Sequence, residues 1–290
     1  MQASAIVRAR DRAHTIEATL QALRSQTVPV EIIVVDSGST DGTIEIAQRY
    51  ADLVVHLPQS EFTYGGALNV GAAAASGDVH FALSAHCAPA YDDWVERSIS
   101  HYTDPAVAGT NQARRAPSGQ LLRSPYAQVP EDVRLDPYWG FSNHASSWRA
   151  DVWRQIPFRE DLEACEDKEW SWRVLAAGWK ILYDPLLHVP AAHRHMESLS
   201  VMWARHRKEA SALAALGAVP RPGVGELVHA LRTTQPDEPS RLPDWLRGCS
   251  PWRLAKLGGD FVGARGPHGT AHPTLDETLP IGGGVRNGAR

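Results

Sequence analysis

The sequence predicts an α/β protein built on an open sheet whose strands are joined by right-handed helical crossovers. Two observations lead to this fold class. Over roughly the first hundred residues, short apolar runs alternate with segments whose apolar residues recur at helical spacing. In addition, four consecutive apolar residues at 32–35 are typical of a strand that is buried on both faces, as in a parallel sheet.

The individual elements follow from the same patterns. Ile16, Leu20 and Leu23 recur at helical spacing, and Asp41 stands where the N-cap of the next helix belongs. The stretch 110–165 is less regular and rich in aromatic residues, which suits a substrate-facing segment. The predicted strands are 4–7, 32–35, 53–56, 79–83 and 180–183, and the predicted helices are 15–25, 43–50, 67–75, a segment capped by Asp92 or Asp93 that runs to 99, 166–177 and 197–216.

The chain divides into a large domain and a smaller C-terminal part. Residues 1–216 hold the alternating strands and helices and are predicted to form one domain. Prolines then become frequent, and 217–264 is predicted to be a helical appendage with helices at 224–232 and 251–263. The Gly- and Pro-rich residues 265–290 have little to bury, which predicts a disordered tail.

Charge and cysteine content exclude several classes of protein. A formal charge of −4 and a pI near 6.3 leave no electrostatic footprint for nucleic acid. Cys87, Cys165 and Cys249 are far apart and odd in number, so neither a disulfide framework nor a cysteine zinc site is predicted. The first residues have no apolar core of signal-peptide length, and no apolar run is long enough to span a membrane. We expect a cytoplasmic protein, with peripheral contact at the inner face of the membrane left open.

Asp36 ends the predicted strand 32–35 and begins a loop of small and polar residues. Open α/β sheets bind ligands at the carboxyl ends of their strands. The Asp36 carboxylate is therefore placed to accept hydrogen bonds from a sugar or a base. The alternative is that Asp36 only stabilises the turn.

A series of motifs occurs along the chain in the order IVVDSGSTDGT, YGGALNVGAAAASGD, FALSAHCAP, FSNHASSWRADVW and CEDKEWSWRVLAAGWKILYDP. With these motifs, roughly residues 3–210 resemble the inverting family 2 glycosyltransferases of the GT-A fold, and above all their bacterial rhamnosyltransferase-like group. The resemblance implies an open mixed sheet flanked by helices. It also implies transfer of a sugar from a nucleoside-diphosphate sugar to a hydroxyl of a glycan, a lipid-linked acceptor or a small molecule.

The resemblance further implies which residues meet the donor. In similar enzymes the loop after the first strand holds the nucleotide, and Arg8 and Arg10 take those places here. A guanidinium can stack on a base or pair with phosphate, although both arginines could also be solvated surface residues. Asn69 is predicted to be structural rather than catalytic. The predicted donor-binding residues are Arg8, Arg10, Asp36, Ser37, Gly65, Gly66, Ser84 and Trp139.

The chain departs from the family pattern where a metal is expected. Family members usually carry an Asp-x-Asp or a single Asp at this strand end, to hold the divalent metal that bridges the donor diphosphate, but this chain has Ser84 and His86. His86 could ligate a metal, with Mn²⁺ favoured over Mg²⁺, could donate directly to the diphosphate, or could have neither role. His193 and His195 are further candidate metal ligands, with a shifted register. Positive charge could instead come from Arg194, Arg205 and Arg207.

The acidic pair Glu166-Asp167 opens the predicted helix 166–177 and matches the E-D-x-x-W pattern of the family. Inverting transfer needs one carboxylate that removes the proton of the acceptor hydroxyl. The resemblance makes Asp167 the general base, with Glu166 orienting donor sugar or acceptor. Acidic residues at helix starts are also ordinary, because they complement the helix dipole.

The aromatic residues near this pair divide into two groups. Trp170 and Trp172 lie on the helix itself and are predicted to pack in the core. Tyr138, Trp139 and Phe141 precede Ser142-Asn143 and are candidates for lining the sugar pocket, since a flat aromatic face suits a pyranose.

The predicted helix 251–263 and its flank mix apolar and basic residues, namely Trp252, Arg253, Leu254, Lys256, Leu257, Phe261, Val262 and Arg265. They could form an amphipathic surface that lies on a membrane. Packing against the catalytic domain or against a second subunit fits the same residues.

Two other functions are compatible with this α/β layout. A nucleotide-sugar-binding module without transferase activity is favoured by His86 at the metal position and disfavoured by the intact Glu166-Asp167 pair. Nucleotidyl transfer to a sugar phosphate usually requires a Gly-rich phosphate loop after the first strand, and the segment ARDRAHT has no glycine.

Overall fold

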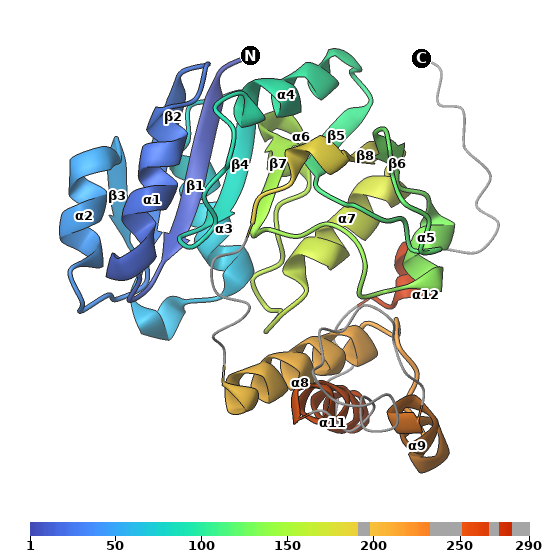
Figure 1. The fold of residues 1–290 in the computed structure, drawn as a ribbon. Helices are drawn as coiled ribbons and strands as arrows, with labels where there is room; N and C mark the ends of the chain where they lie inside the picture. Colours follow the sequence, from blue (N-terminus) through green and yellow to red (C-terminus); the bar gives the residue numbers. More distant parts are fainter. Residues whose placement is uncertain (191–197, 233–250, 267–272, 280–290) are drawn as a thin grey trace. The chain divides into compact units, whose positions relative to one another are not determined.

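The computed structural model describes residues 1–190, 198–232, 251–266 and 273–279 (Figure 1). The described chain forms two compact units. The first contains Met1–Leu162 and continues from Glu166, and the second contains Glu163–Cys165 and the described residues from 198 onward. The sequence prediction places 197–216 in the large domain, whereas the structure groups the described residues of this segment, 198–216, with the C-terminal helices.

An eight-stranded mixed sheet forms the centre of the first unit (Figure 1). In spatial order its strands are β3 (Leu53–His56), β2 (Val30–Asp36), β1 (Ala3–Ala9), β4 (Val79–Ser84), β7 (Ala145–Arg149), β5 (Val107–Asn111), β8 (Lys180–Tyr183) and β6 (Tyr126–Ala127). The first four strands are parallel, and β5 is parallel to β8. β7 runs antiparallel to both β4 and β5, and β6 runs antiparallel to β8. This confirms the predicted α/β fold class.

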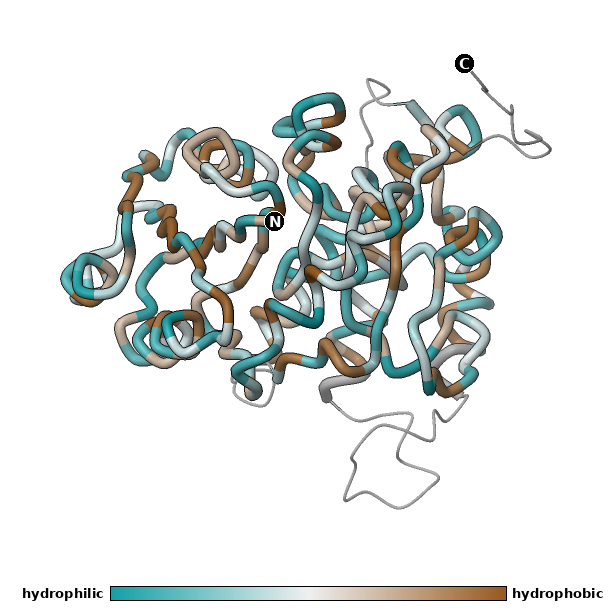
Figure 2. The backbone as a smooth tube through the Cα atoms, turned by 90° about the horizontal axis from the view of Figure 1, so that it is seen from above, coloured by the Kyte–Doolittle hydropathy of each residue, from teal (hydrophilic) through white to brown (hydrophobic). Residues whose placement is uncertain are grey.

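Helices cover both faces of the sheet. One face packs against α1 (Ala13–Arg24), α2 (Thr43–Tyr50) and α4 (Trp94–Ser100), and the other against α3 (Tyr64–Ala74), α6 (Ala150–Gln155) and α7 (Glu166–Ala176). In Figure 2 the coils of the helices carry both hydrophobic and hydrophilic residues, as expected of helices that bury one side. The remaining short elements of this unit are α5 (Pro130–Leu135), η1 (Gln59–Glu61), η2 (His101–Thr103) and η3 (Pro185–Leu187).

Local interactions explain where two helices begin. The Thr63 hydroxyl accepts a hydrogen bond from the Gly66 N–H at 2.9 Å and so caps α3. Helix α2 begins after Gly42, whose φ of 89° is left-handed, so the predicted N-cap at Asp41 is wrong by one residue. The Asp41 carboxylate instead accepts from the Thr43 N–H at 3.1 Å and the Ala13 N–H at 3.0 Å, which ties the starts of α1 and α2 together.

The middle of the chain is more regular than its sequence suggests. The segment 110–165 contributes β6, α5, β7 and α6, and β7 lies in the centre of the sheet. The buried Ser147 hydroxyl on β7 shares hydrogen bonds of 2.7 Å with the hydroxyls of Ser98, Tyr102 and Thr110. Because buried hydroxyls that bond one another carry no unpaired polar group, a polar sequence can form a central strand here.

The second unit is helical in its described part. Its elements are α8 (Leu199–Ala215), α9 (Val224–Arg232), α11 (Pro251–Arg265) and α12 (Leu275–Thr278). A Cβ added to Gly259 or Gly263 on α11 would lie 2.6 or 2.1 Å from the backbone of α8, so the absence of side chains lets these helices pack closely.

Helix α12 lies within 265–290, the segment predicted to be a disordered tail. The Thr274 and Glu277 side chains form a capping box at its start, and Leu275 and Leu279 are buried. Among the described helices, none is both long enough and apolar enough to cross a membrane.

Candidate active site

A cavity of about 310 Å³ lies where β1, β2 and β4 end. Open α/β sheets bind ligands at this edge, because the loops after parallel strands meet there. The cavity wall contains three arginines, two aromatic rings and a histidine, which are Arg8, Arg10, Arg12, Phe62, Tyr64 and His86. Such a wall combines positive charge for an anion with flat apolar surfaces for a ring.

The sequence predictions and the cavity overlap in part. Of the predicted donor and metal residues, those that line the cavity are Arg8, Arg10, Ser37, Ser84 and His86. The prediction missed Arg12, Gln59, Phe62 and Tyr64. Phe62 and Tyr64 make an edge-to-face contact with ring centroids 5.3 Å apart. The available signal was the position of Tyr64 directly before the glycine pair of the YGGALN motif.

The Asp36 carboxylate turns into its own loop. The residue is 1% exposed, and its Oδ2 accepts hydrogen bonds from the N–H groups of Gly38 and Ser39, each at 3.0 Å. Its Oδ1 accepts from the Ser39 hydroxyl. Ser37, the next residue, lines the cavity instead. These contacts match the alternative of a turn residue, and a contact of Asp36 with a nucleoside stays a prediction.

Neighbouring parts of the chain leave no room for a side chain at Gly65 and Gly66. A Cβ on Gly65 would lie 2.0 Å from the carbonyl oxygen of Arg159, and one on Gly66 would lie 2.8 Å from the Thr63 hydroxyl. At these two positions, atoms of the protein itself make the close approach to the backbone that was predicted for a ligand. Asn69, on the same helix, bonds the backbone of Phe158 through both its amide oxygen and its nitrogen, which matches its predicted structural role.

We expect Gly65→Ala to lower the free energy of unfolding by about 3 kcal/mol, the upper end of the usual cost of overpacking, because the new methyl meets backbone that cannot rotate away. Urea unfolding followed by circular dichroism would measure this loss. Gly225→Ala is the matched control, since Gly225 is also helical and has open space around its Cβ position. Equal stability of the two variants would contradict the clash.

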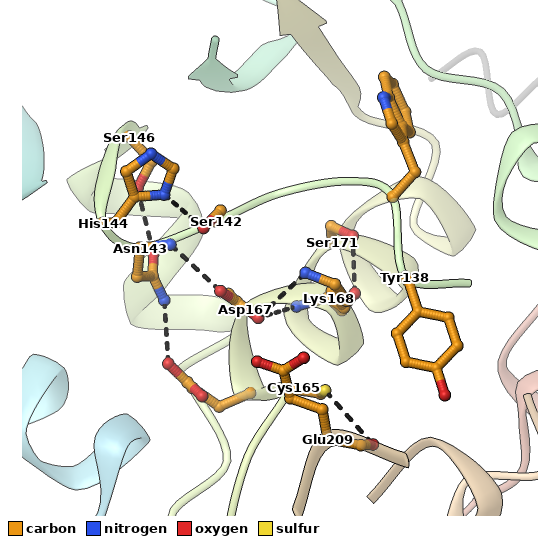
Figure 3. Close-up of polar contacts among 12 residues, drawn as sticks. Tyr138, Ser142, Asn143, His144, Ser146, Cys165, Asp167, Lys168, Ser171 and Glu209 are labelled. Carbon is orange, nitrogen blue, oxygen red and sulfur yellow. Dashed lines mark hydrogen bonds and ion pairs between the residues drawn. The ribbon is translucent and has the colours of Figure 1, made fainter. Parts of the chain in front are cut away.

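The two acidic side chains at the start of α7 are held by one asparagine. The Asn143 backbone N–H donates to Asp167 Oδ2 at 3.2 Å, and its side-chain Nδ2 donates to Glu166 Oε1 at 3.4 Å (Figure 3). Its Oδ1 accepts from the Ser146 hydroxyl at 3.1 Å, and the residue is 1% exposed. No role was predicted for Asn143 from the sequence, although it lies inside the FSNHASSWRADVW motif.

Arg8 connects this acidic pair to the cavity. Its guanidinium lies 3.6 Å from Glu166 Oε1, and it donates to the Asn143 carbonyl at 3.0 Å. It also lies over the Tyr64 ring, 5.5 Å from the ring centroid. The contact of Arg8 with a nucleotide stays a prediction, and the structure adds an ion pair that the sequence did not reveal.

Glu166 is buried and is a weaker acid than usual. Burial and the negative charge of Asp167 raise its pKa and the guanidinium of Arg8 lowers it, which leaves the pKa at about 7. The site thus joins a cationic cavity to a pair of carboxylates, one of which changes charge near neutral pH. Such an arrangement can bind an anionic group and accept a proton beside it.

The predicted metal and sugar residues are only partly brought together. His86 lines the cavity, whereas His193 and His195 lie outside the described residues. Trp139 stacks on Tyr183 with centroids 4.2 Å apart, away from the cavity wall, and Tyr138 is 37% exposed. The structure contradicts a pocket role for Phe141, which is fully buried. Trp170 and Trp172 are buried as predicted.

Comparisons with known proteins identify similar chains. The family model described as glycosyl transferase family 2 matches residues 4–158. Relatives include the glycosyltransferase AglE of Haloferax volcanii, 28% identical over 194 residues, and the O-antigen chain rhamnosyltransferase RfbN of Salmonella typhimurium, 24% identical over 196 residues. These matches cover 62% and 61% of this chain and 63% and 62% of the relatives, so the chain spans less than two thirds of their length.

Solved structures show the same fold. The mannosyltransferase PcManGT from Pyrobaculum calidifontis, in complex with GDP-Man and Mn²⁺, matches with a TM-score of 0.57 and 18% identity over 89% of this chain and 69% of that chain. TarS 1–349 of S. aureus, in complex with UDP-GlcNAc, matches with a TM-score of 0.51 and 17% identity over 73% of this chain and 66% of that chain. Because the family model covers more than half of its residues, the chain belongs to glycosyl transferase family 2.

Proposed function

We propose that the chain transfers a sugar from a nucleoside-diphosphate sugar to an acceptor hydroxyl with inversion, and that Asp167 is the general base. The main support is that a cavity lined by three arginines adjoins a carboxylate pair, with Arg8 contacting both. A diphosphate suits the cationic cavity. The family membership and the complexes of PcManGT with GDP-Man and of TarS with UDP-GlcNAc agree with such a donor.

In this reaction the acceptor oxygen forms a bond to the anomeric carbon of the donor while the bond from that carbon to the diphosphate breaks. The nucleoside diphosphate leaves with the electron pair, and the acceptor proton passes to Asp167. Attack from the side opposite the leaving group inverts the anomeric carbon. The Asn143 N–H would hold the Asp167 carboxylate in position during this step.

We also propose that a divalent metal, Mn²⁺ before Mg²⁺, accompanies the diphosphate, as Mn²⁺ does in the PcManGT complex. The described residues fit such an ion only in part. His86 and Ser84 line the cavity, but within the described residues no group of three or more His, Cys, Asp or Glu side chains could hold an ion. Further ligands would have to come from the phosphate oxygens and from His193 and His195. When bound, the ion would neutralise charge on the leaving diphosphate.

Calorimetric binding of UDP, dTDP and GDP, each with Mn²⁺, with Mg²⁺ and with chelator, tests the donor site. We expect one nucleotide to bind tightly and chelator to weaken it, which would identify the donor class and the need for a metal. Failure of every nucleotide to bind would overturn the proposed function. Binding without any sugar transfer to an acceptor panel would favour a nucleotide-sugar-binding module instead.

We expect His86→Ala to weaken nucleotide binding by at least about tenfold, the equivalent of ~1.4 kcal/mol, because His86 lines the cavity. The same calorimetry measures this change with metal and with chelator. His56→Ala is the matched control, since His56 also ends a strand but does not line the cavity. Unchanged affinity of His86→Ala in both conditions would exclude a role at the diphosphate.

The acceptor and the location in the cell stay predictions. A glycan, a lipid-linked molecule and a small molecule all offer the required hydroxyl, and cytoplasmic nucleotide sugars would serve as donors. The C-terminal helix α11 packs on α8 but leaves Leu254 and Val262 exposed, at 45% and 47%. These side chains are available for a peripheral membrane contact or for a second subunit.

A further inference from the structure

Arg8 is shared between the donor cavity and the acidic pair. Its guanidinium lines the cavity, and it is the cation that faces Glu166. The Arg8 side chain is 13% exposed and that of Glu166 is 6% exposed, so solvent screens this contact only weakly. A change in the position of Arg8 will therefore strongly change the electrostatic stabilisation of the Glu166 carboxylate.

The contact between the two is loose. The Arg8 nitrogen and Glu166 Oε1 are 3.6 Å apart, whereas a charge-assisted hydrogen bond of this type is typically about 2.7–2.9 Å long. The second guanidinium nitrogen is anchored to the Asn143 carbonyl at 3.0 Å. Arg8 is thus held firmly at one nitrogen, while the other makes only long contacts, with Glu166 Oε1 at 3.6 Å and with the Tyr64 carbonyl at 3.4 Å, and can serve a second anion in the cavity.

The charge on Glu166 depends on this cation. The groups that face Glu166 are Asp167 on its own helix, Arg8 from β1 and the uncharged Asn143 amide that precedes β7. Lys168 Nζ lies 4.0 Å from Asp167 Oδ1. Burial, and after it the Asp167 carboxylate, raises the pKa of the Tyr183 hydroxyl on β8. Burial and Asp167 both raise the pKa of Glu166, to about 7, against the opposing positive charge of Arg8.

We propose that donor binding is coupled to proton uptake, because the diphosphate draws the Arg8 guanidinium toward itself and Glu166 then takes a proton from the solvent. The proton adds to a carboxylate oxygen of Glu166, and no other bond changes. This inference rests on the proposed nucleotide site and goes beyond it by giving Arg8 a positioning role. The phosphate charges themselves act on Glu166 in the same direction.

The uptake distinguishes the two carboxyl groups when the donor is in place. Glu166 becomes neutral and can donate a hydrogen bond, while Asp167 carries the negative charge of the pair. A group whose pKa is higher in the bound state strengthens binding at low pH, so nucleotide affinity falls as pH rises through and above neutrality.

Proton uptake can be counted by calorimetry of nucleotide binding in buffers that differ in their enthalpy of ionisation, at pH 7 and under one metal condition. If the pKa of Glu166 rises from about 7 to about 8 on binding, uptake at pH 7 is about 0.4 proton per nucleotide. We also expect affinity to fall between pH 7 and pH 8.5. A wild-type protein that binds nucleotide without uptake overturns this inference and leaves the proposed function standing.

Variants separate Glu166 from other sources of protons. In Glu166→Gln we expect affinity to change less than about threefold, the equivalent of ~0.6 kcal/mol, while the uptake disappears. Proton changes that come from the nucleotide or from His86 would persist in Glu166→Gln and would overturn the assignment. Arg8→Gln should bind more weakly and show little uptake at pH 7, because Glu166 is then already protonated, whereas Arg8→Lys should restore part of it. A protein that binds no nucleotide overturns both proposals together.

Discussion

Asp167→Asn is expected to lower turnover by a factor on the order of 10²–10⁴, the usual contribution of a positioned general base. The amide cannot accept the acceptor proton, yet its single oxygen can still receive one of the two hydrogen bonds that hold the carboxylate, which come from the Asn143 N–H to Oδ2 at 3.2 Å and from the Lys168 N–H to Oδ1 at 2.8 Å. The start of α7 should therefore keep its geometry. Initial rates of sugar transfer, measured with the nucleotide sugar that the binding panel selects, give the loss.

Two comparisons make this result specific. Nucleotide affinity of Asp167→Asn should stay close to that of the wild type, because Asp167 does not line the cavity. Asp151→Asn is the matched control, since Asp151 also stands in the first turn of a helix and accepts a hydrogen bond from the next N–H, at 2.9 Å. Retention of more than about a tenth of wild-type turnover in Asp167→Asn would rule out the base assignment.

Trp170→Ala is expected to lower the free energy of unfolding by about 3–5 kcal/mol, the range measured for large aromatic residues in cores. Trp170 is fully buried on α7, where its ring packs against Phe141 and Phe158 with centroids 5.0 and 5.2 Å away. Its indole N–H also donates to the Ile156 carbonyl at 2.7 Å, and the truncation leaves that acceptor unpaired. Urea unfolding measures the loss.

Two further variants resolve what the Trp170 side chain contributes. Trp170→Phe keeps an aromatic ring and loses the N–H, so we expect a smaller loss of about 1–3 kcal/mol. Trp179→Ala, at a half-buried position next to the same core cluster, should cost less than Trp170→Ala. If Trp170→Ala unfolded within about 1 kcal/mol of the wild type, the core around α7 would be less tightly packed than the contacts indicate.

Apolar runs predicted the parallel half of the sheet well, because strands such as β2 are buried on both faces and can only be apolar there. The same reasoning missed β7. Its residues ASSWR look like a loop, and their burial is made possible by hydroxyl partners on α4, η2 and β5 that lie 37 to 49 positions away in sequence. Hydrophobic pattern alone carries no information on such distant hydrogen-bond partners.

The candidate site was likewise predictable from the sequence only in part. Motifs located Arg8, Ser37 and His86 at the cavity, since their positions follow from where strands end. The pairing of Arg8 with Glu166 was not predictable, because it joins β1 to α7 through residues that are 158 positions apart in sequence. Asp36 illustrates the converse. Its position at the strand end is as predicted, but the loop folds back to satisfy the carboxylate locally.

The reversed direction of β7 has a consequence for how such a protein can diversify. Because Ala145 pairs with Leu83, the chain enters β7 at the edge where β4 leaves the sheet. At this edge, therefore, the residues that precede β7 lie beside the segments that follow β1, β2, β3 and β4. Those four segments form the cavity wall, and the stretch before β7 is separate from them in sequence. We expect exchange of the segment before Asn143 to alter which molecule receives the sugar while the choice of nucleotide stays the same.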